Sequence, residues 1–412
     1  MSEPLNTYVH LRAEGLSVVV DLSEGRLPAI VHWGADLGEL TCPDVTTLAR
    51  AGVHPIVANI VDEPVRIGLL PEHHTGWVGR PGISGSRAGR DWSPLFTTSG
   101  LRVDGVTVAA GAERPSLITL GTAELEITAT DEVAGLGLLI RIELTTGGLL
   151  RSQATLTNRG ADDYQLDDLV LAYPVPPVAR ELLDLAGHWG RERVPQRREL
   201  TTGVHLREGR KGRTGADAAT VLHAGVPGFC FGSGETWGVH VGWSGNHTHY
   251  AERAFTGEQL LGGGELLLPG EMVLGPGGSY TSPWLYGSHG DGLDEVARRF
   301  HRWLRSRPTH PSPERPMTLN VWEAVYFDHE LQPLLELADA AAAIGVERYV
   351  LDDGWFGSRR DDFSGLGDWT VSKDVWPDGL HPLVDHVTEL GMQFGLWFEP
   401  EMVNLDSEVA RA

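Results

Sequence analysis

The sequence predicts a large all-β domain over residues 1–289, a linker helix and connection over residues 290–315, and an α/β domain over residues 316–412. Three observations lead to this division. Short strand-like runs fill the chain from Tyr8 to about Pro283, helical periodicity replaces them near residue 290, and strands alternate with helices after Pro316. A length of 412 residues also suits two or three domains.

The first domain is read from alternating apolar runs separated by turn residues, such as LSVVVDLSEGRLPAIVHW at 16–33 and LGLLIRIELTTGGLLRSQATLTN at 136–158. Asp104-Gly105 between apolar flanks is the signal of a type I′ hairpin, and the glycines at 147 and 148 mark a similar turn. Strands at regular spacing with almost no helical periodicity are typical of a large β-sandwich.

The segment GDGLDEVARRFHRWLRSRP at 290–308 predicts a linker helix, because its apolar residues recur every three or four positions. Asp291 is the candidate N-cap and Pro308 the candidate stop. The proline-rich stretch THPSPERP at 309–316 then marks the boundary to a different architecture.

After Pro316 the sequence predicts strands at Met317–Trp322, at Arg348–Asp352 and within QFGLWFEPE at 393–401. Helices are expected near 334–344 and 383–390, with a final helix capped by Asp406. This order predicts a parallel sheet, either open or closed as a (β/α) barrel.

Each of these strands ends in polar or aromatic residues: Trp322-Glu323, Asp352-Asp353 and Trp397-Phe398-Glu399. Reactive residues of barrel enzymes lie at such carboxyl ends. Adjacent strand residues point to opposite faces, whereas a retaining glycosidase needs two carboxyl groups about 5 Å apart and aimed at one carbon. The aspartate pair is therefore better suited to accept sugar hydroxyl groups than to act as the two catalytic carboxylates.

Two alternatives for the aspartate pair stay open from the residues alone. One aspartate could cap the following turn while the other lies exposed. A magnesium site would need further oxygen ligands or a phosphate, and no Walker-type loop accompanies the pair.

The composition of the chain excludes several classes of binding partner. A formal charge of −23 disfavours nucleic acid, and no apolar stretch is long enough to predict a membrane span. The start of the chain lacks the pattern of a secretory signal, so we expect a cytoplasmic protein. The only cysteines, Cys42 and Cys230, exclude a disulfide framework and are expected to be buried thiols.

One long loop-like stretch, residues 73–96, is rich in glycine, arginine and tryptophan, and loops of that length often have a function. Glu72, His73 and His74 resemble metal ligands by residue type but lack the spacing of a zinc-binding helix, so no metal site is predicted.

Three segments resemble family 36 glycoside hydrolases, the melibiase-type microbial α-galactosidases: VWEAVYFD at 321–328, YVLDDGWFGSRRDDFSGLGDWTVSKDVWPDGL at 349–380 and LGMQFGLWFEPEMVN at 390–404. A looser likeness extends upstream through GVHVGWSGNH at 238–247. The resemblance implies an N-terminal β-supersandwich followed by a (β/α)₈ TIM barrel, of which this chain would contain the first three βα units.

The same resemblance implies roles for individual residues. Asp352 and Asp353 would hydrogen-bond the galactose hydroxyls, including the axial one, while Trp322 and Trp397 would shape the same subsite. Three further positions match the family with a less defined role: Glu399, Asp368 and Trp369.

The implied activity is hydrolysis of terminal α-galactosyl residues, as in melibiose or raffinose, with retention, without a cofactor, and in a tetramer. The family's nucleophile lies in a lysine-tryptophan-aspartate motif on the fourth barrel strand, and neither that motif nor the acid/base motif occurs before Ala412. We therefore expect no catalytic residue in this chain, and an N-terminal fragment without turnover by itself. The alternatives are an α-N-acetylgalactosaminidase or galactosyl transferase of the same family, or a non-catalytic or vestigial galactoside-binding protein.

Overall fold

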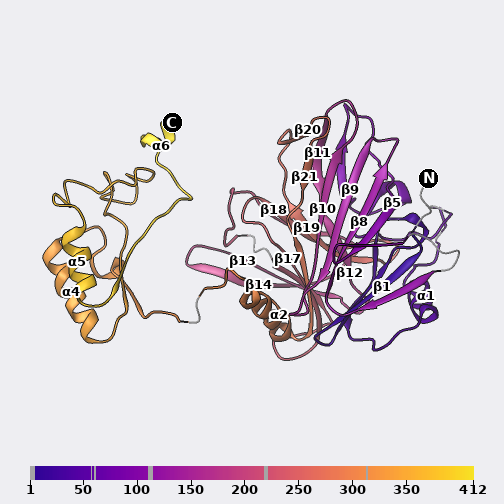
Figure 1. Cartoon of the computed structure of the whole chain (residues 1–412), viewed down its shortest axis with the longest axis horizontal. Helices are drawn as coiled ribbons and strands as arrows, with labels where there is room; N and C mark the ends of the chain where they lie inside the picture. Colours follow the sequence, from indigo (N-terminus) through magenta and orange to yellow (C-terminus); the bar gives the residue numbers. More distant parts are fainter. Residues whose placement is uncertain (1–4, 57, 60–61, 110–114, 218–220, 312–313) are drawn as a thin grey trace. The chain divides into compact units, whose positions relative to one another are not determined.

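The computed structural model describes residues 5–56, 58–59, 62–109, 115–217, 221–311 and 314–412. The chain divides into two compact units, Met1–His310 and Pro311–Ala412 (Figure 1). The proline-rich connection expected at 309–316 lies partly outside the described residues. Each unit is built around its own buried apolar cluster.

In the described part of the chain, the first unit is organised around a sheet of eleven strands whose paired neighbours run antiparallel. Its path runs through β14 (Arg191–Glu199), β13 (Glu181–His188), β16 (Val221–Gly225), β17 (Glu235–Val241), β22 (Leu285–Asp291), β10 (Leu150–Asn158), β9 (Leu136–Leu144), β8 (Ala123–Asp131), β5 (Thr97–Val103) and β6 (Val106–Val108), with β21 (Ser279–Thr281) paired to β10. Buried and half-buried residues alternate along β9 and β10, as the sequence pattern predicts for strands with one face in a core.

The described residues of this unit form three smaller sheets besides the large one. They contain β3 (Ala29–Ala35), β2 (Leu16–Asp21), β1 (Thr7–Ala13) and β7 (Ser116–Leu120); β12 (Leu171–Pro174), β19 (Gln259–Glu265), β18 (His247–Arg253) and β15 (Gly203–Gly209); and β20 (Met272–Leu274), β11 (Tyr164–Leu169) and β4 (Ile83–Ser86). One apolar cluster draws residues from all four sheets, including Val9, Ile140, Leu166 and Leu261. The prediction of a β-rich first domain is confirmed.

Both predicted hairpin turns are present. Asp104 and Gly105 have φ values of 47° and 78°, as a type I′ turn between β5 and β6 requires. Gly148, with φ 74°, lies in the turn between β9 and β10.

Three local predictions for this unit are wrong. An unpredicted helix, α1 (Cys42–Ala51), begins at a capping box in which Thr41 and Asp44 bond each other's backbone. Cys42 is half-buried and Cys230 exposed, so neither is a core thiol. Gly292, and not Asp291, is the N-cap of α2 (Leu293–Ser306), since Asp291 accepts a hydrogen bond from the backbone N–H of Gly234.

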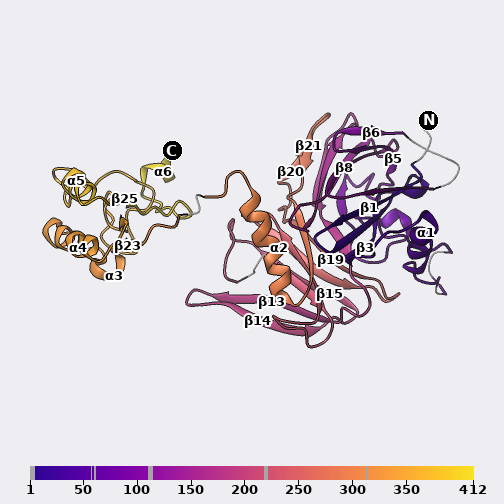
Figure 2. The same cartoon turned by 60° about the horizontal axis from the view of Figure 1, so that its bottom comes forward.

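Helix α2, which is labelled in Figure 2, packs against β22 and β17 of the first unit. Arg299 on this helix is 2% exposed, and its guanidinium donates to the carbonyl oxygens of His289 and Glu14 and to the carboxylate of Glu295. These bonds explain how an arginine is tolerated on the buried face of the helix.

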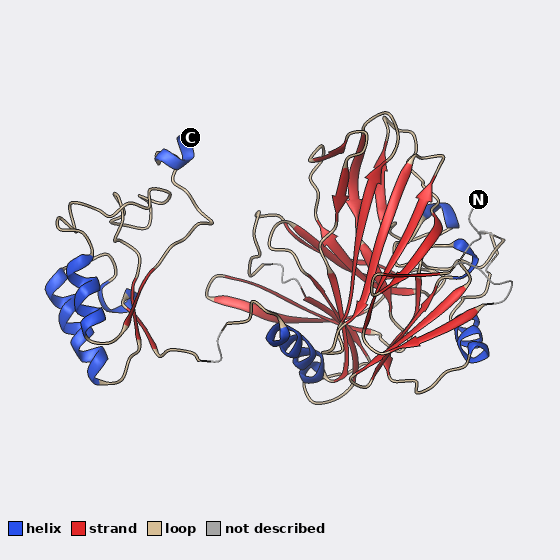
Figure 3. Cartoon of the chain, in the orientation of Figure 1, coloured by secondary structure: helices blue, strands red, loops and turns tan. Residues whose placement is uncertain are grey.

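Within residues 314–412, the second unit contains three parallel strands, β23 (Thr318–Asn320), β24 (Arg348–Leu351) and β25 (Gln393–Leu396). Helix α4 (Leu331–Ala343) connects the first two strands, and α5 (His381–Glu389) precedes the third. The two helices pack side by side (Figure 3), and His386 on α5 lies 2.8 Å from Asp339 on α4. The predicted order of strands and helices and the parallel sheet are confirmed.

Two ends in this unit differ from the prediction. Strand β23 stops at Asn320, because Trp322 begins a single helical turn, α3 (Trp322–Val325). The final helix, α6 (Glu408–Arg411), is capped by the Ser407 hydroxyl and not by Asp406. No helix among the described residues is both long and apolar enough to cross a membrane.

Candidate functional site

The candidate site lies where the three parallel strands of the second unit end. The register pairs Asn320 with Val350 and Leu351 with Leu396, so the carboxyl ends of neighbouring strands are level. Asp352 and Asp353 follow β24 directly, and Trp397 follows β25. The sheet therefore brings these side chains to one edge, as parallel strands do.

Asp352 is held at the strand end by two hydrogen bonds. Its Oδ2 accepts from the side-chain amide of Asn320, at the end of β23, and its Oδ1 accepts from the backbone N–H of Asp353 at 2.7 Å. The side chain is nearly inaccessible, since the residue is 6% exposed. The oxygen of the Asn320 amide accepts from the backbone N–H of Trp322 at 2.8 Å, so one asparagine contacts two of the predicted site residues.

Asp353 is 5% exposed and paired with Arg359. Nε of Arg359 lies 2.9 Å from Oδ1 and 3.0 Å from Oδ2, and Nη2 lies 2.7 Å from Oδ2. Burial lowers the pKa of Arg359, but the hydrogen bonds to Asp353 and the charge of that carboxylate raise it overall, so the guanidinium stays charged.

The backbone leaves the strand through Gly354, whose φ of 106° is accessible mainly to glycine. A Cβ at this position would lie 3.2 Å from the Phe327 ring and 3.4 Å from the His329 ring. Arg360 then donates to the carbonyl oxygens of Gly354 and Gly357. The exit from the strand is thus fixed by a close approach on one side and a guanidinium on the other.

The predicted aromatic residues form two groups. Trp397 and Trp369 have ring centroids 6.3 Å apart, and Trp369 packs on Phe356 at 4.4 Å. Trp322 packs edge-on against Tyr326 and Phe327 instead. The indole N–H of the buried Trp355 donates to the carbonyl oxygen of Trp397, which ties the segment after β24 to the end of β25.

The other two predicted carboxylates, Asp368 and Glu399, do not contact the aspartate pair directly in the described residues. Oδ1 of Asp368 accepts from the backbone N–H of Glu408 at the start of α6, a local structural contact. Glu399 is half-buried and contributes its negative charge to the surroundings of Arg359. Among the described residues, neither carboxylate hydrogen-bonds to the aspartate pair or to its tryptophans.

Asn320 and Arg359 were not predicted as site residues, although the sequence contains an indication of each. Asn320 is a polar residue at a strand end, the same criterion that selected Asp352. A buried carboxylate needs an ion-pair or hydrogen-bond partner, and the loop that follows the aspartates offers two candidate cations, Arg359 and Arg360.

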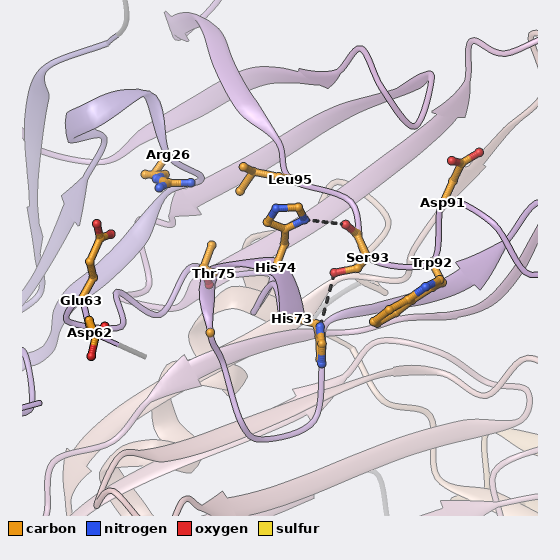
Figure 4. Close-up of a pocket in the computed structure, with 11 residues that line it drawn as sticks. Arg26, Asp62, Glu63, His73, His74, Thr75, Asp91, Trp92, Ser93 and Leu95 are labelled. Atoms are coloured by element: carbon orange, nitrogen blue, oxygen red, sulfur yellow. Dashed lines mark hydrogen bonds between the residues drawn. The ribbon is translucent and has the colours of Figure 1, made fainter. Parts of the chain in front are cut away.

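The long stretch at 73–96 is not a continuous loop, since it contains a 3₁₀ turn (His73–Thr75) and strand β4. Its two ends, residues 73–76 and 91–95, help to line an open pocket of about 1020 Å³ in the first unit (Figure 4). His73 and His74 both turn toward Ser93: His74 Nδ1 donates to the Ser93 carbonyl oxygen at 2.9 Å, and His73 Nδ1 lies 3.3 Å from the Ser93 hydroxyl. Within the described residues, no three His, Cys, Asp or Glu side chains are grouped so as to hold a metal ion.

Comparison with known proteins gives the chain a family. The model of the glycosyl hydrolase family 36 N-terminal domain matches residues 26–275, and the melibiase model matches residues 279–412. An α-galactosidase of Escherichia coli is 37% identical over 386 residues, which are 93% of this chain and 51% of the E. coli protein. α-Galactosidase AgaA of Geobacillus stearothermophilus is 34% identical over 293 residues, covering 70% of this chain and 40% of AgaA.

Solved structures agree with the sequence matches. The crystal structure of an AgaA variant in complex with raffinose superimposes with a TM-score of 0.85 at 28% identity, covering 98% of this chain and 57% of that chain. Another AgaA variant, in complex with stachyose, gives a TM-score of 0.81 at 27% identity, covering 98% of this chain and 58% of that one. The chain spans about half the length of the curated relatives it matches. With a family model matching more than half of its residues, the chain belongs to glycosyl hydrolase family 36.

Proposed function

We propose that the chain carries the galactose-binding part of an α-galactosidase that hydrolyses terminal α-galactosyl residues with retention. The observation that carries this proposal is the buried Asp352–Asp353 pair at the end of β24, held by Asn320 and Arg359. A carboxylate accepts about four hydrogen bonds, so both aspartates keep acceptor sites for sugar hydroxyl groups. Family membership and the names of the relatives support the activity.

The pair is suited to binding and not to both chemical roles. Retaining hydrolysis needs a nucleophilic carboxylate and a protonated acid on opposite sides of the anomeric carbon, about 5 Å apart. Asp353 is already ion-paired, and Asp352 accepts two hydrogen bonds from neighbouring groups. We therefore expect these 412 residues by themselves to bind galactosides without hydrolysing them.

The proposed substrates are α-galactosides such as melibiose and raffinose, and the proposed assembly of the active enzyme is a tetramer. The raffinose and stachyose complexes of AgaA variants support the substrate class. Trp397, directly after β25, and Trp369, in the loop between β24 and α5, have ring centroids 6.3 Å apart. Their indoles are suited to contact the apolar face of a sugar ring.

The test is a titration of the purified 412-residue chain with methyl α-galactoside, followed by tryptophan fluorescence, alongside hydrolysis of p-nitrophenyl α-galactoside. We expect saturable binding, at least tenfold weaker in Asp353→Asn, since the lost charge removes a strong acceptor. Asp385→Asn, an exposed carboxylate on α5, is the matched control.

Two results would count against the proposal. If the unmodified chain showed no binding of methyl α-galactoside, the galactose-binding function would be wrong. Release of nitrophenol above background would leave the α-galactosidase activity standing and overturn the expectation that these residues lack turnover.

A further inference from the structure

The ion pair between Asp353 and Arg359 is unusual in being buried on both sides, with side-chain exposures of 7% and 5%. Burying two charges costs free energy that their attraction offsets only when geometry and additional hydrogen bonds are good. Such a pair is therefore a weak source of stability. What it does supply is a fixed direction for both side chains.

The guanidinium is held from several sides. Besides the bonds to Asp353, Nη1 of Arg359 donates to the carbonyl oxygen of Ser364 at 3.0 Å, and Cζ lies 5.5 Å from the centroid of the Phe327 ring. The loop closes tightly at Gly365, where a Cβ would lie 2.5 Å from the backbone nitrogen of Arg359. The arginine is thus anchored independently of the carboxylate that it contacts.

The hydrogen bonds also leave the two oxygens of Asp353 unequal. Oδ2 accepts from both Nε and Nη2, whereas Oδ1 accepts from Nε alone. With about two lone-pair directions per oxygen, Oδ2 is saturated and Oδ1 has one acceptor site left.

We propose that Arg359 is a positioning residue that fixes Asp353 so that its Oδ1 accepts one galactose hydroxyl. The inference rests on the proposed galactose-binding function and assigns a new role within that site. Arg359 acts through Asp353 and does not touch the sugar. Selectivity for galactosides over glucosides depends on this orientation, because the two sugars differ in the direction of a single hydroxyl group.

The experiment measures affinity for methyl α-galactoside and methyl α-glucoside in the full 412-residue chain and in four variants: Arg359→Met, Arg359→Lys, Asp353→Asn and the double variant Asp353→Asn/Arg359→Met. Arg359→Met should weaken galactoside binding at least tenfold and reduce the preference over glucoside. Arg359→Lys should retain part of the galactoside affinity and part of the preference over glucoside, since lysine keeps the charge but not the bidentate geometry. Arg348→Met, at the opposite end of β24 and bonded to Gln393, is the control.

The double variant separates positioning from folding. If Arg359 acts only through Asp353, adding Arg359→Met to Asp353→Asn should weaken binding no further. The double variant also removes both charges, so it avoids the unpaired buried carboxylate that could prevent Arg359→Met from folding.

A purely structural role for Arg359 would lower the melting temperature of its variants and leave the galactoside-to-glucoside ratio of the folded protein unchanged, which would overturn the proposal. Fully additive losses in the double variant would overturn it too. If the unmodified chain still binds methyl α-galactoside, either of these results leaves the proposed galactose-binding function intact. If the unmodified chain does not bind it, the proposed function and the role of Arg359 are both overturned.

Discussion

The side-chain amide of Asn320 donates a hydrogen bond to Asp352, and this contact joins the ends of two neighbouring parallel strands. The same amide accepts a hydrogen bond from the backbone of Trp322. One short side chain thereby orients a carboxylate and the start of the helical turn that presents a tryptophan.

Replacing Asn320 tests this contact. Asn320→Ala should weaken methyl α-galactoside binding by about 1–2 kcal/mol, because a buried acceptor loses its donor. Asn320→Asp should weaken it further, since a second carboxylate would face Asp352. Fluorescence titration measures both, with Thr318→Ala at the other end of β23 as control. Unchanged affinity in both Asn320 variants would show that Asp352 needs no such support.

Gly354→Ala should destabilise the second unit by about 1–3 kcal/mol and abolish measurable sugar binding. There are two reasons. The φ angle of Gly354 is 106°, which alanine rarely adopts, and the new Cβ would lie 3.2 Å from the Phe327 ring and 3.4 Å from the His329 ring. Gly379→Ala is the matched control, since φ is also positive there but no atom of the described residues lies within 4 Å of the added Cβ. Equal shifts in melting temperature for the two variants would contradict the steric argument.

We expect the stability of the first unit to depend on pH, because the pKa of the buried Glu72 is raised. Burial raises its pKa from 4.5 to about 7, although its carboxylate accepts a hydrogen bond from the backbone N–H of Phe96. A raised carboxyl pKa favours the folded state below pH 4.5, and this contribution is lost as the pH rises to about 7.

Glu72→Gln should therefore leave stability near pH 4 unchanged and increase it at pH 8 by up to about 3 kcal/mol. Urea unfolding at the two pH values measures the difference. Glu132→Gln, on the surface, should show no such pattern. A Glu72→Gln variant that is less stable at pH 8 would mean that the charge of Glu72 is required.

For the buried His249 we expect the opposite effect, a loss of stability as the pH falls. It is 1% exposed, and neither ring nitrogen has a hydrogen-bond partner within the described part of the chain. Burial, and then the neighbouring His247, lowers its pKa from 6.5 to about 3. The folded state thus favours the neutral ring, and its stability is complete above pH 6.5 and falls as the pH drops toward 3.

The charged and titratable groups around this histidine are His247, Asp184, Arg207 and His205. His249→Phe should make the loss of stability between pH 7 and pH 5 smaller by about 2 kcal/mol. The exposed His301→Gln is the control. If the urea midpoints of His249→Phe and of the unmodified chain fell equally over this range, other histidines would account for the acid sensitivity.

The elements that the sequence predicted best are those with strong local patterns. The alternation in β9 and β10 and the glycine turns between strands follow from local sterics, and the βαβ order follows from periodicity. Helix α1 was missed because it is short, rich in β-branched residues and buries only Val45 fully. Trp322 was placed on a strand because aromatic residues favour strands, whereas tertiary contacts turn it into α3.

At the site, the sequence pointed to Asp352 and Asp353 because two carboxylates after an apolar run are conspicuous. Their partners were harder to find. Asn320 precedes Asp352 by more than thirty residues, and only the parallel register of β23 and β24 brings them together. The choice of Arg359 over the adjacent Arg360 depends on how the loop folds after Gly354.

Strand β1 pairs with β2, its neighbour along the chain, and in parallel with β7, more than one hundred residues later. During synthesis at about 5–20 residues per second, the β1–β2 hairpin emerges from the ribosome roughly 5–20 s before β7 is available. For that time the outer edge of β1, an apolar strand, has no partner and is open to other nascent chains. Folding of the first unit on the ribosome should therefore benefit from a chaperone that binds extended apolar segments.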